Sequence, residues 1–285
     1  MREAPPGPGA PPGSESSWPA PATVPPSPVV PPFTPLPSVE SRPEGAGWEP
    51  RGDEPAIAFP VPWRWWAPFG VFVLVQVVVV LAAGLGVALF GESRLYPIAV
   101  VATGLATVSV TIGWVRVRHP GQVRRLFGPV RVNLTDAARG AGLGVLAYLG
   151  ANVALSQLIT YVVTRSGNEL PPVQEDLQAA LTAPGVGLLI SAVVVVLVPL
   201  GEELLFRGML FSALRDRVPL WPAIGLSGLV FGLSHVEPLA IVLTFPAGML
   251  WAWGFHRRGT LVTSVAAHAV FNLINVVLLR SGLGT

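Results

Sequence analysis

Long apolar runs separated by short polar links dominate the chain after residue 62. Charge-free windows of roughly 20 residues recur there, which is the length that a helix needs to cross about 30 Å of hydrocarbon. The pattern therefore predicts an all-α fold, a polytopic membrane helix bundle of about seven transmembrane helices. The expected spans are Phe69 to Phe90, Leu95 to Val115, Ala141 to Val163, Val186 to Leu214, Trp221 to Val236, Leu239 to Phe255 and Thr260 to Leu279.

Two of these spans are unusual. The fourth is too long for one straight crossing, and Pro199 is expected to kink it just before a charged motif. The fifth and sixth are short, and only Glu237 and Pro238 separate them, so they can form a tight hairpin or a partly re-entrant pair.

The first 62 residues differ from the rest, since they hold nineteen of the chain's 31 prolines and no apolar run long enough to pack. We expect residues 1–62 to be a disordered Pro-rich cytoplasmic tail, without an identified partner, and residues 63–285 to be a multi-pass membrane domain. The tail lacks the basic and apolar regions of a secretory signal. Trp63, Trp65 and Trp66 surround Arg64 and suggest an interfacial aromatic belt before the first span.

Composition agrees with a membrane protein. Hydrophobic residues make up 51% of the chain and charged residues 12%, and the mean hydropathy is +0.59. The chain has no cysteine, which excludes disulfides and thiol nucleophiles. The net charge of +2 with no basic patch argues against nucleic-acid binding. Every basic residue is arginine rather than lysine, a bias typical of a GC-rich bacterial genome, so we expect a bacterial plasma membrane.

The arginines predict the orientation. The link between spans two and three is rich in arginine, and the link between spans three and four is mainly acidic, so the first should be cytoplasmic. Counting outward, the N-terminus and the links with Arg215, Arg217, Arg257 and Arg258 are also expected in the cytoplasm. The basic link contains Arg116, Arg118, Arg124, Arg125, Arg131 and Arg139, and the acidic one Arg165, Glu169, Glu175 and Asp176.

The fourth span ends in GEELLFRG, from Gly201 to Gly208. Ionisable residues at membrane depth are costly unless they are paired or face water. Glu203 and Arg207 are four apart and can form a structural ion pair on one helical face. That pair does not explain Glu202, which points about 100° away from Glu203.

Two other spans carry polar residues at similar depth. The fifth contains FGLSH, with Phe231 and His235 four apart, and the seventh contains HAVFN, with His268 and Asn272 four apart. A lone intramembrane His or Asn is often a packing residue. Spans one to three contain no acidic residue, arginine or histidine, however, so the concentration of these groups in spans four, five and seven indicates one shared site.

The three motifs, E-E-x-x-x-R, F-x-x-x-H and H-x-x-x-N on successive membrane helices, resemble those of the CAAX prenyl protease and bacteriocin-processing family of intramembrane proteases, called CPBP or Abi. The resemblance covers about residues 141–279. It implies peptide-bond hydrolysis in a peptide or membrane-protein substrate, with Glu202 as the base and His268 and Asn272 as the oxyanion hole.

The residue types suit that chemistry. Amide hydrolysis needs an activated water, oxyanion stabilisation and a proton for the leaving amine. Glu202 can act as general base and then acid, and His235 can hold the water. Glu203 and Arg207 would hold the helix in place. If zinc took part, Glu202, His235 and His268 would be its ligands, but this would consume the base. No H-E-x-x-H motif is present, so we expect metal-free catalysis.

Two alternatives remain open. Gly225 to Gly228 reads GLSG, like the nucleophile motif of rhomboid serine proteases, with Ser227 as nucleophile and His268 as base. That reading leaves Glu202 and Asn272 without a role. The other alternative is a non-catalytic membrane scaffold, an immunity protein or a proton-coupled transporter that uses the same polar residues.

Overall fold

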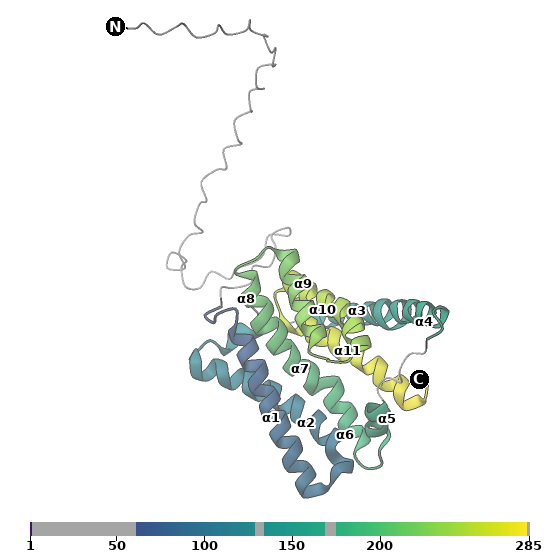
Figure 1. The fold of residues 1–285 in the computed structure, drawn as a ribbon. Helices are drawn as coiled ribbons and strands as arrows, with labels where there is room; N and C mark the ends of the chain where they lie inside the picture. The colour runs from purple at the N-terminus through teal and green to yellow at the C-terminus, as the bar shows by residue number, and fades with distance from the viewer. Residues whose placement is uncertain (2–60, 129–133, 169–174, 284–285) are drawn as a thin grey trace, which may run out of the picture. The chain divides into compact units, whose positions relative to one another are not determined.

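The computed structural model describes Met1 and residues 61–128, 134–168 and 175–283, and the described residues from Val61 onward belong to one compact unit (Figure 1). The predicted disorder of the tail concerns residues outside the described ones. Within the described ranges all regular elements are helices. The α-helices are α1 (Ala67–Phe90), α2 (Leu95–Arg118), α3 (Leu134–Ala147), α4 (Ser156–Arg165), α5 (Glu175–Thr182), α6 (Gly187–Ala192), α7 (Val198–Glu203), α8 (Ser212–Arg215), α9 (Leu220–Leu233), α10 (Pro238–Arg258) and α11 (Leu261–Ser281).

Six continuous helices among the described residues are long and apolar enough to cross a membrane. They match six predicted spans, with α3 and α4 joined through Tyr148–Leu155 into one helix, Leu134–Arg165. The remaining span, predicted as the fifth, is α9; it has 14 residues, and the prediction that it continues to Val236 was wrong. The chain turns before Pro238, which opens α10, and Val236 has a positive φ of 65° that no helix accommodates. The fold is a multi-pass helix bundle, as predicted.

The predicted fourth span is one continuous helix, Gly187–Arg215, which we call the motif helix. Its winding changes twice from α to π, at η5 (Val193–Leu197) and η6 (Leu204–Phe211). Pro199 lies in the first turn of α7, which follows the first π segment. Its ring has no N–H for the ordinary helical bond, and this accounts for the changed winding there. The expected distortion before the charged motif thus takes the form of a wide turn, a feature that often marks functional sites.

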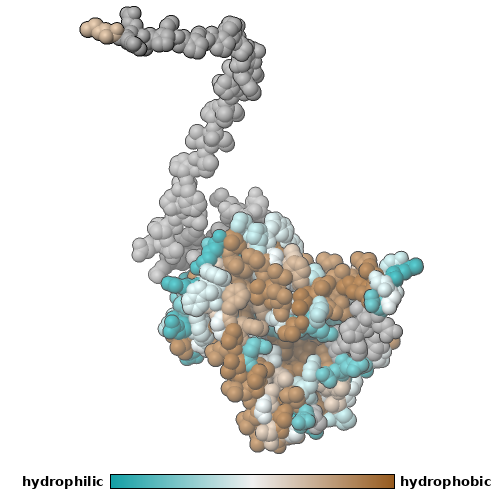
Figure 2. Space-filling model, in the orientation of Figure 1, coloured by the Kyte–Doolittle hydropathy of each residue, from teal (hydrophilic) through white to brown (hydrophobic). Residues whose placement is uncertain are grey.

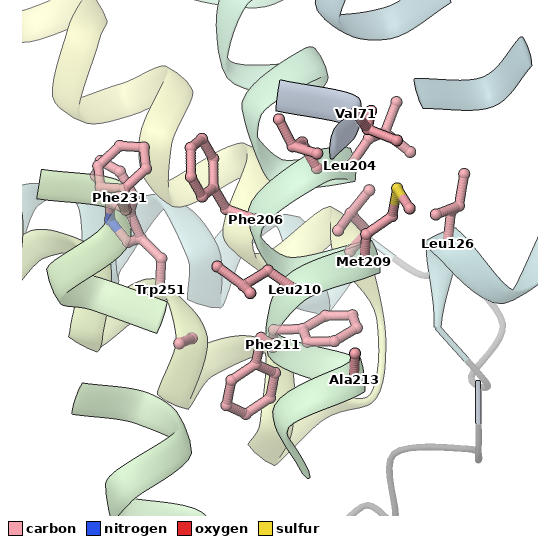
Figure 3. Close-up of a cluster of buried hydrophobic side chains, with 14 of the residues drawn as sticks. Val71, Leu126, Leu204, Phe206, Met209, Leu210, Phe211, Ala213, Phe231 and Trp251 are labelled. Atoms are coloured by element: carbon pink, nitrogen blue, oxygen red, sulfur yellow. The ribbon is translucent and has the colours of Figure 1, made fainter. Parts of the chain in front are cut away.

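The motif helix runs through the middle of the bundle (Figure 1). α1 and α2 pack together, and α2 also packs against α7. On the other side, α10 pairs with α9 and α11 pairs with α3. α3 approaches α11 so closely that a side chain at Gly140 or Gly144 would collide with the backbone carbonyls of Thr263 and Ala267. Large side chains of the motif helix pack in one core with residues of α1 on one side and of α9 and α10 on the other (Figure 3).

Trp63 differs from its prediction. Trp65 and Trp66 are exposed, as an interfacial belt requires, but Trp63 is buried in the core at 2% exposure. Its indole N–H donates to the carbonyl of Met209, 3.1 Å away in the second π segment. The backbone N–H of Val61 also donates to Asp216 at 2.9 Å. The segment before α1 is therefore fastened to the end of the motif helix.

The surface of the bundle carries many exposed large apolar side chains, which Figure 2 shows as broad brown areas. On α1 alone, Val80, Leu81, Leu85 and Leu89 are each more than half exposed. Apolar surface of this extent would be unstable in water but suits a lipid environment.

Candidate active site

Glu203 and Arg207 form an ion pair inside the motif helix. The guanidinium Nη1 lies 2.9 Å from Glu203 Oε1, and both side chains have 0% exposure. The predicted pairing of these two residues is therefore present in the structure. A buried pair needs further hydrogen bonds to offset the cost of removing two charges from water.

Arg207 finds these partners on neighbouring helices. Its Nη2 donates to the carbonyl of Gly248 in α10 at 2.9 Å. Its guanidinium carbon lies 4.5 Å from the ring centre of Phe231 and 5.4 Å from that of Trp251. The approach requires a glycine at position 248, since a Cβ there would lie 2.9 Å from the Phe231 ring and 3.2 Å from Arg207. Arg207 thus ties the motif helix to α9 and α10.

The two adjacent glutamates have different surroundings. Glu203 is completely buried, whereas the side chain of Glu202 keeps 17% of its surface exposed. The difference follows from the rotation of about 100° between successive helical residues. His268 of α11 lies between the two carboxylates, with Nδ1 3.1 Å from Glu203 Oε1 and Nε2 3.7 Å from Glu202 Oε2. Glu202 is therefore the more accessible carboxylate of the two.

The contacts of His268 fix how its ring is used. Glu203 is held as a carboxylate by Arg207, so His268 Nδ1 must donate to it. Nε2 then faces Glu202 and is an acceptor in the neutral ring or a donor in the charged ring. The ring stacks on Trp251, with centroids 4.1 Å apart and an interplanar angle of 20°. We call Glu202, Glu203, Arg207 and His268 the polar cluster.

His235 lies beside the polar cluster rather than inside it. It follows the end of α9, where its Nδ1 lies 3.0 Å from the carbonyl of Phe231. The Phe231 ring contacts both histidine rings, at 4.9 Å from His235 and 5.6 Å from His268. Among the described residues, no hydrogen bond joins His235 to either glutamate.

A strained turn sets the position of His235. The N–H of Glu237 donates to the carbonyl of His235 at 2.7 Å, across Val236 with its φ of 65°. This three-residue turn is rare and costly for a β-branched residue. Strained backbone of this kind is often found at functional sites.

Asn272 lies one turn after His268 on α11, as the motif spacing predicts. Its amide donates to the carbonyl of Val194 at 2.9 Å. Val194 belongs to the first π segment of the motif helix, where carbonyls lose their ordinary partners. An amide has two N–H donors, so this bond uses one and leaves the other.

Sequence reasoning missed Trp251 and Gly248, both of which contact members of the polar cluster. They lie on the sixth predicted span, which contains no motif, and no local spacing points to them. It also missed Asn152, which donates to Asn275 of α11 at 2.6 Å. Intramembrane asparagines at 152 and 275 were a visible signal, but their pairing depends on how two distant helices meet.

The zinc alternative does not fit the residues that the structure describes. Within the described ranges, no three or more histidine, aspartate or glutamate side chains are grouped so that they could hold a metal ion. The ligand set considered from the sequence was Glu202, His235 and His268. His235 points to the carbonyl of Phe231 instead, and His268 is occupied by Glu203.

The GLSG segment is a helix-packing element. Ser227 is completely buried in α9, and its hydroxyl lies 3.4 Å from the carbonyl of Phe206. A Cβ at Gly228 would lie 2.6 Å from the side chain of Met249 in α10. The small residues thus allow α9 and α10 to pack closely. Among the described contacts, none joins Ser227 to His268.

Comparison with known proteins agrees with the geometry. Residues 184–274 match the family model described as type II CAAX prenyl endopeptidase Rce1-like. This range contains all three motifs, and the match confirms the family resemblance predicted from them. No curated protein and no solved structure matches the chain. The match supports a CAAX-type intramembrane protease in general terms.

Proposed function

We propose that this protein is an intramembrane endopeptidase that hydrolyses a peptide bond with a water molecule activated by Glu202. The match over residues 184–274 supports the protease class, and the surroundings of Glu202 support its role as the base. The substrate is a peptide or membrane protein that reaches the site from the bilayer. Its cleavage would take place at the depth of the polar cluster.

The observation that carries this proposal is the difference between the two glutamates. Glu203 has no exposed surface, and Arg207 and His268 both bond to its Oε1, so this carboxylate is enclosed by protein and committed to structural contacts. Glu202 has 17% exposure, and His268 Nε2 is 3.7 Å away, longer than a hydrogen bond. Glu202 therefore has open space beside its carboxylate in which a water molecule can bind, and Glu203 has none.

In the proposed reaction Glu202 acts twice, first as the base and then as the acid. Glu202 removes a proton from water as the oxygen attacks the carbonyl carbon, and it returns the proton to the leaving nitrogen when the tetrahedral intermediate breaks down. His268, in its charged form, donates Nε2–H to the oxyanion, while Nδ1–H stays on Glu203. The second N–H of Asn272 is the other donor. His235 holds the attacking water or the substrate next to Phe231.

The orientation belongs to the same proposal. The described arginines at both ends of the α9–α10 hairpin, Arg215 with Arg217 and Arg257 with Arg258, lie on the side that we assign to the cytoplasm. The motif helix then runs from the outer to the inner side of the plasma membrane. The N-terminus is cytoplasmic.

The test is N-terminal labelling of membrane proteins after incubation of the host's membrane fraction with purified protein in liposomes. New N-termini should appear with the wild type. Glu202→Gln preserves the shape of the side chain and removes the proton acceptor, so cleavage should fall roughly 100-fold or more. Ser227→Ala is the matched control and should cleave at the wild-type rate.

The remaining outcomes identify the alternatives. An active Glu202→Gln protein beside an inactive Ser227→Ala protein would replace this mechanism with a serine nucleophile. No new N-termini with folded wild-type protein would favour a scaffold, an immunity protein or a transporter. Normal elution and melting of each variant must accompany the activity measurements.

A further inference from the structure

A second feature of the bundle is an apolar cavity between α1, the motif helix and α9, with a volume of about 170 Å³. We call it the α1–α9 pocket. Apart from Ser234, its lining is aliphatic, aromatic or proline. The residues that matter for the argument are Phe69 and Phe72 of α1, Leu205 and Phe206 of the motif helix, and Val230 and Leu233 of α9.

The pocket shares a wall with the polar cluster. Phe206 lines the pocket and meets Phe231 edge to face, with ring centroids 5.2 Å apart. Figure 3 shows Phe206 extending from the motif helix toward Phe231. Phe231 in turn contacts Arg207 and both site histidines. The rings of Phe206 and Phe231, in contact with each other, therefore link the pocket to the polar cluster.

The pocket also lies close to Glu202 along the motif helix. Leu205 and Phe206 follow Glu202 by three and four residues, which is about one turn or about 5 Å of helix rise. Directly after α9, Ser234 lines the pocket and precedes His235. An extended substrate with its scissile bond at Glu202 would place a neighbouring side chain within reach of this pocket.

The pocket is bounded by lipid-facing residues. Among its lining residues, Leu205 and Phe206 are buried, but Phe69 is 38% exposed and Leu233 is 54% exposed. Both lie on helices of the apolar bundle surface. A side chain entering the pocket would therefore come from the hydrocarbon phase and would have to be apolar, because the described lining offers it no charged partner.

The volume decides between a side chain and a lipid. An apolar cavity of about 150 Å³ holds one benzene-sized molecule. The pocket thus accommodates one leucine or phenylalanine side chain but not a whole acyl chain. We propose that the α1–α9 pocket is a specificity subsite that binds one apolar side chain of the substrate, at a fixed position next to the cleaved bond. This inference rests on the proposed peptidase function.

The experiment compares cleavage-site profiles from the same N-terminal labelling. Val230→Phe fills the pocket from α9, and Phe72→Ala enlarges it from α1. Leu229→Phe is the matched control, since Leu229 is the neighbouring residue on α9, is 42% exposed and does not line the pocket. All four proteins are used as full chains in liposomes.

The wild type should show Leu, Met or Phe enriched at one position beside the cleaved bond. Val230→Phe should shift that position to Ala or Val by about tenfold or more, whereas Phe72→Ala should favour the largest residues, because hydrophobic pockets discriminate by size. Leu229→Phe should retain the wild-type profile. Val230→Phe should still cleave sites with a small residue at that position at the wild-type rate.

Results that contradict the subsite alone can be distinguished from results that contradict the peptidase proposal. Cleavage by folded Val230→Phe and Phe72→Ala with the wild-type profile would overturn the subsite and leave the peptidase proposal intact. The same shift in Leu229→Phe would also overturn it, since the effect would not come from the pocket. Absence of cleavage by the wild type would overturn both proposals. If one pocket variant fails to fold, the profile of the other decides.

Discussion

The carboxylate of Glu203 and the guanidinium of Arg207 lie 2.9 Å apart, and neither side chain has any exposed surface. Glu203 is the last residue of α7, Arg207 lies in the second π segment that follows it, and Arg207 also reaches the carbonyl of Gly248. The pair therefore fixes α10 against the helix that carries Glu202. Its contribution to activity is expected to act through folding and position.

Removal of Arg207 should lower the yield of folded protein. Arg207→Ala leaves the carboxylate of Glu203 buried without its cation, which typically costs about 3–5 kcal/mol. The double variant Glu203→Gln with Arg207→Met removes both charges and keeps an acceptor for His268, so it should recover most of the yield. Size-exclusion chromatography and thermal melting measure this. A double variant as unstable as Arg207→Ala would show that the loss comes from Arg207 packing.

Asn272→Ala should reduce peptide hydrolysis by about 10² to 10³-fold, because an oxyanion donor is lost. The matched control is Asn275→Ala on the same helix, where the lost bonds are to Asn152 and Phe271. Initial rates and melting temperatures are measured for both. Equal losses of rate would mean that the Asn272 side chain supports only the fold, through its bond to Val194.

Trp63→Ala should lower the melting temperature clearly, since the variant loses a fully buried indole and its hydrogen bond to Met209. Trp66→Ala is the control, because Trp66 is 53% exposed.

By the same argument, deletion of residues 2–59 should preserve activity and deletion of residues 2–65 should not. Equal stability of the two tryptophan variants would contradict the anchoring role of the segment before α1.

Chelation should leave activity unchanged. The described residues offer no cluster of three metal ligands, and the proposed mechanism uses none. Purified protein is incubated with EDTA, desalted and assayed against untreated protein. Loss of rate that zinc restores would instead assign Glu202 and the histidines to metal binding.

The C-terminus should lie outside the cytoplasm. The short helix α9, at 14 residues, does not need to cross the whole bilayer, because α9 and α10 form a pair with arginines at both ends. The chain therefore enters and leaves this pair on one side, and α11 makes the last crossing. Reporter fusions after Leu283 and before Val61 should respond on opposite sides. Reporters on the same side would mean that one span is miscounted.

The sequence by itself determined the helix bundle and the spacing of the candidate site residues along their helices. Spans follow from uninterrupted apolar length, and the pair of Glu203 and Arg207 follows from a spacing of four on one helix. The motif spacing likewise placed His268 and Asn272 one turn apart. These properties depend only on neighbours along the chain, so the order of residues is sufficient to predict them.

Contacts between helices were decided by the tertiary structure. Trp251 stacks on His268, Asn272 bonds to Val194, and Trp63 is buried against Met209 instead of lying at the interface. His235 similarly lies in a strained turn after α9 rather than on its face. Each outcome depends on how far one helix is rotated and shifted against another. The lipid-facing and core-facing sides of such helices are both largely apolar, so the pattern of apolar residues does not encode that rotation.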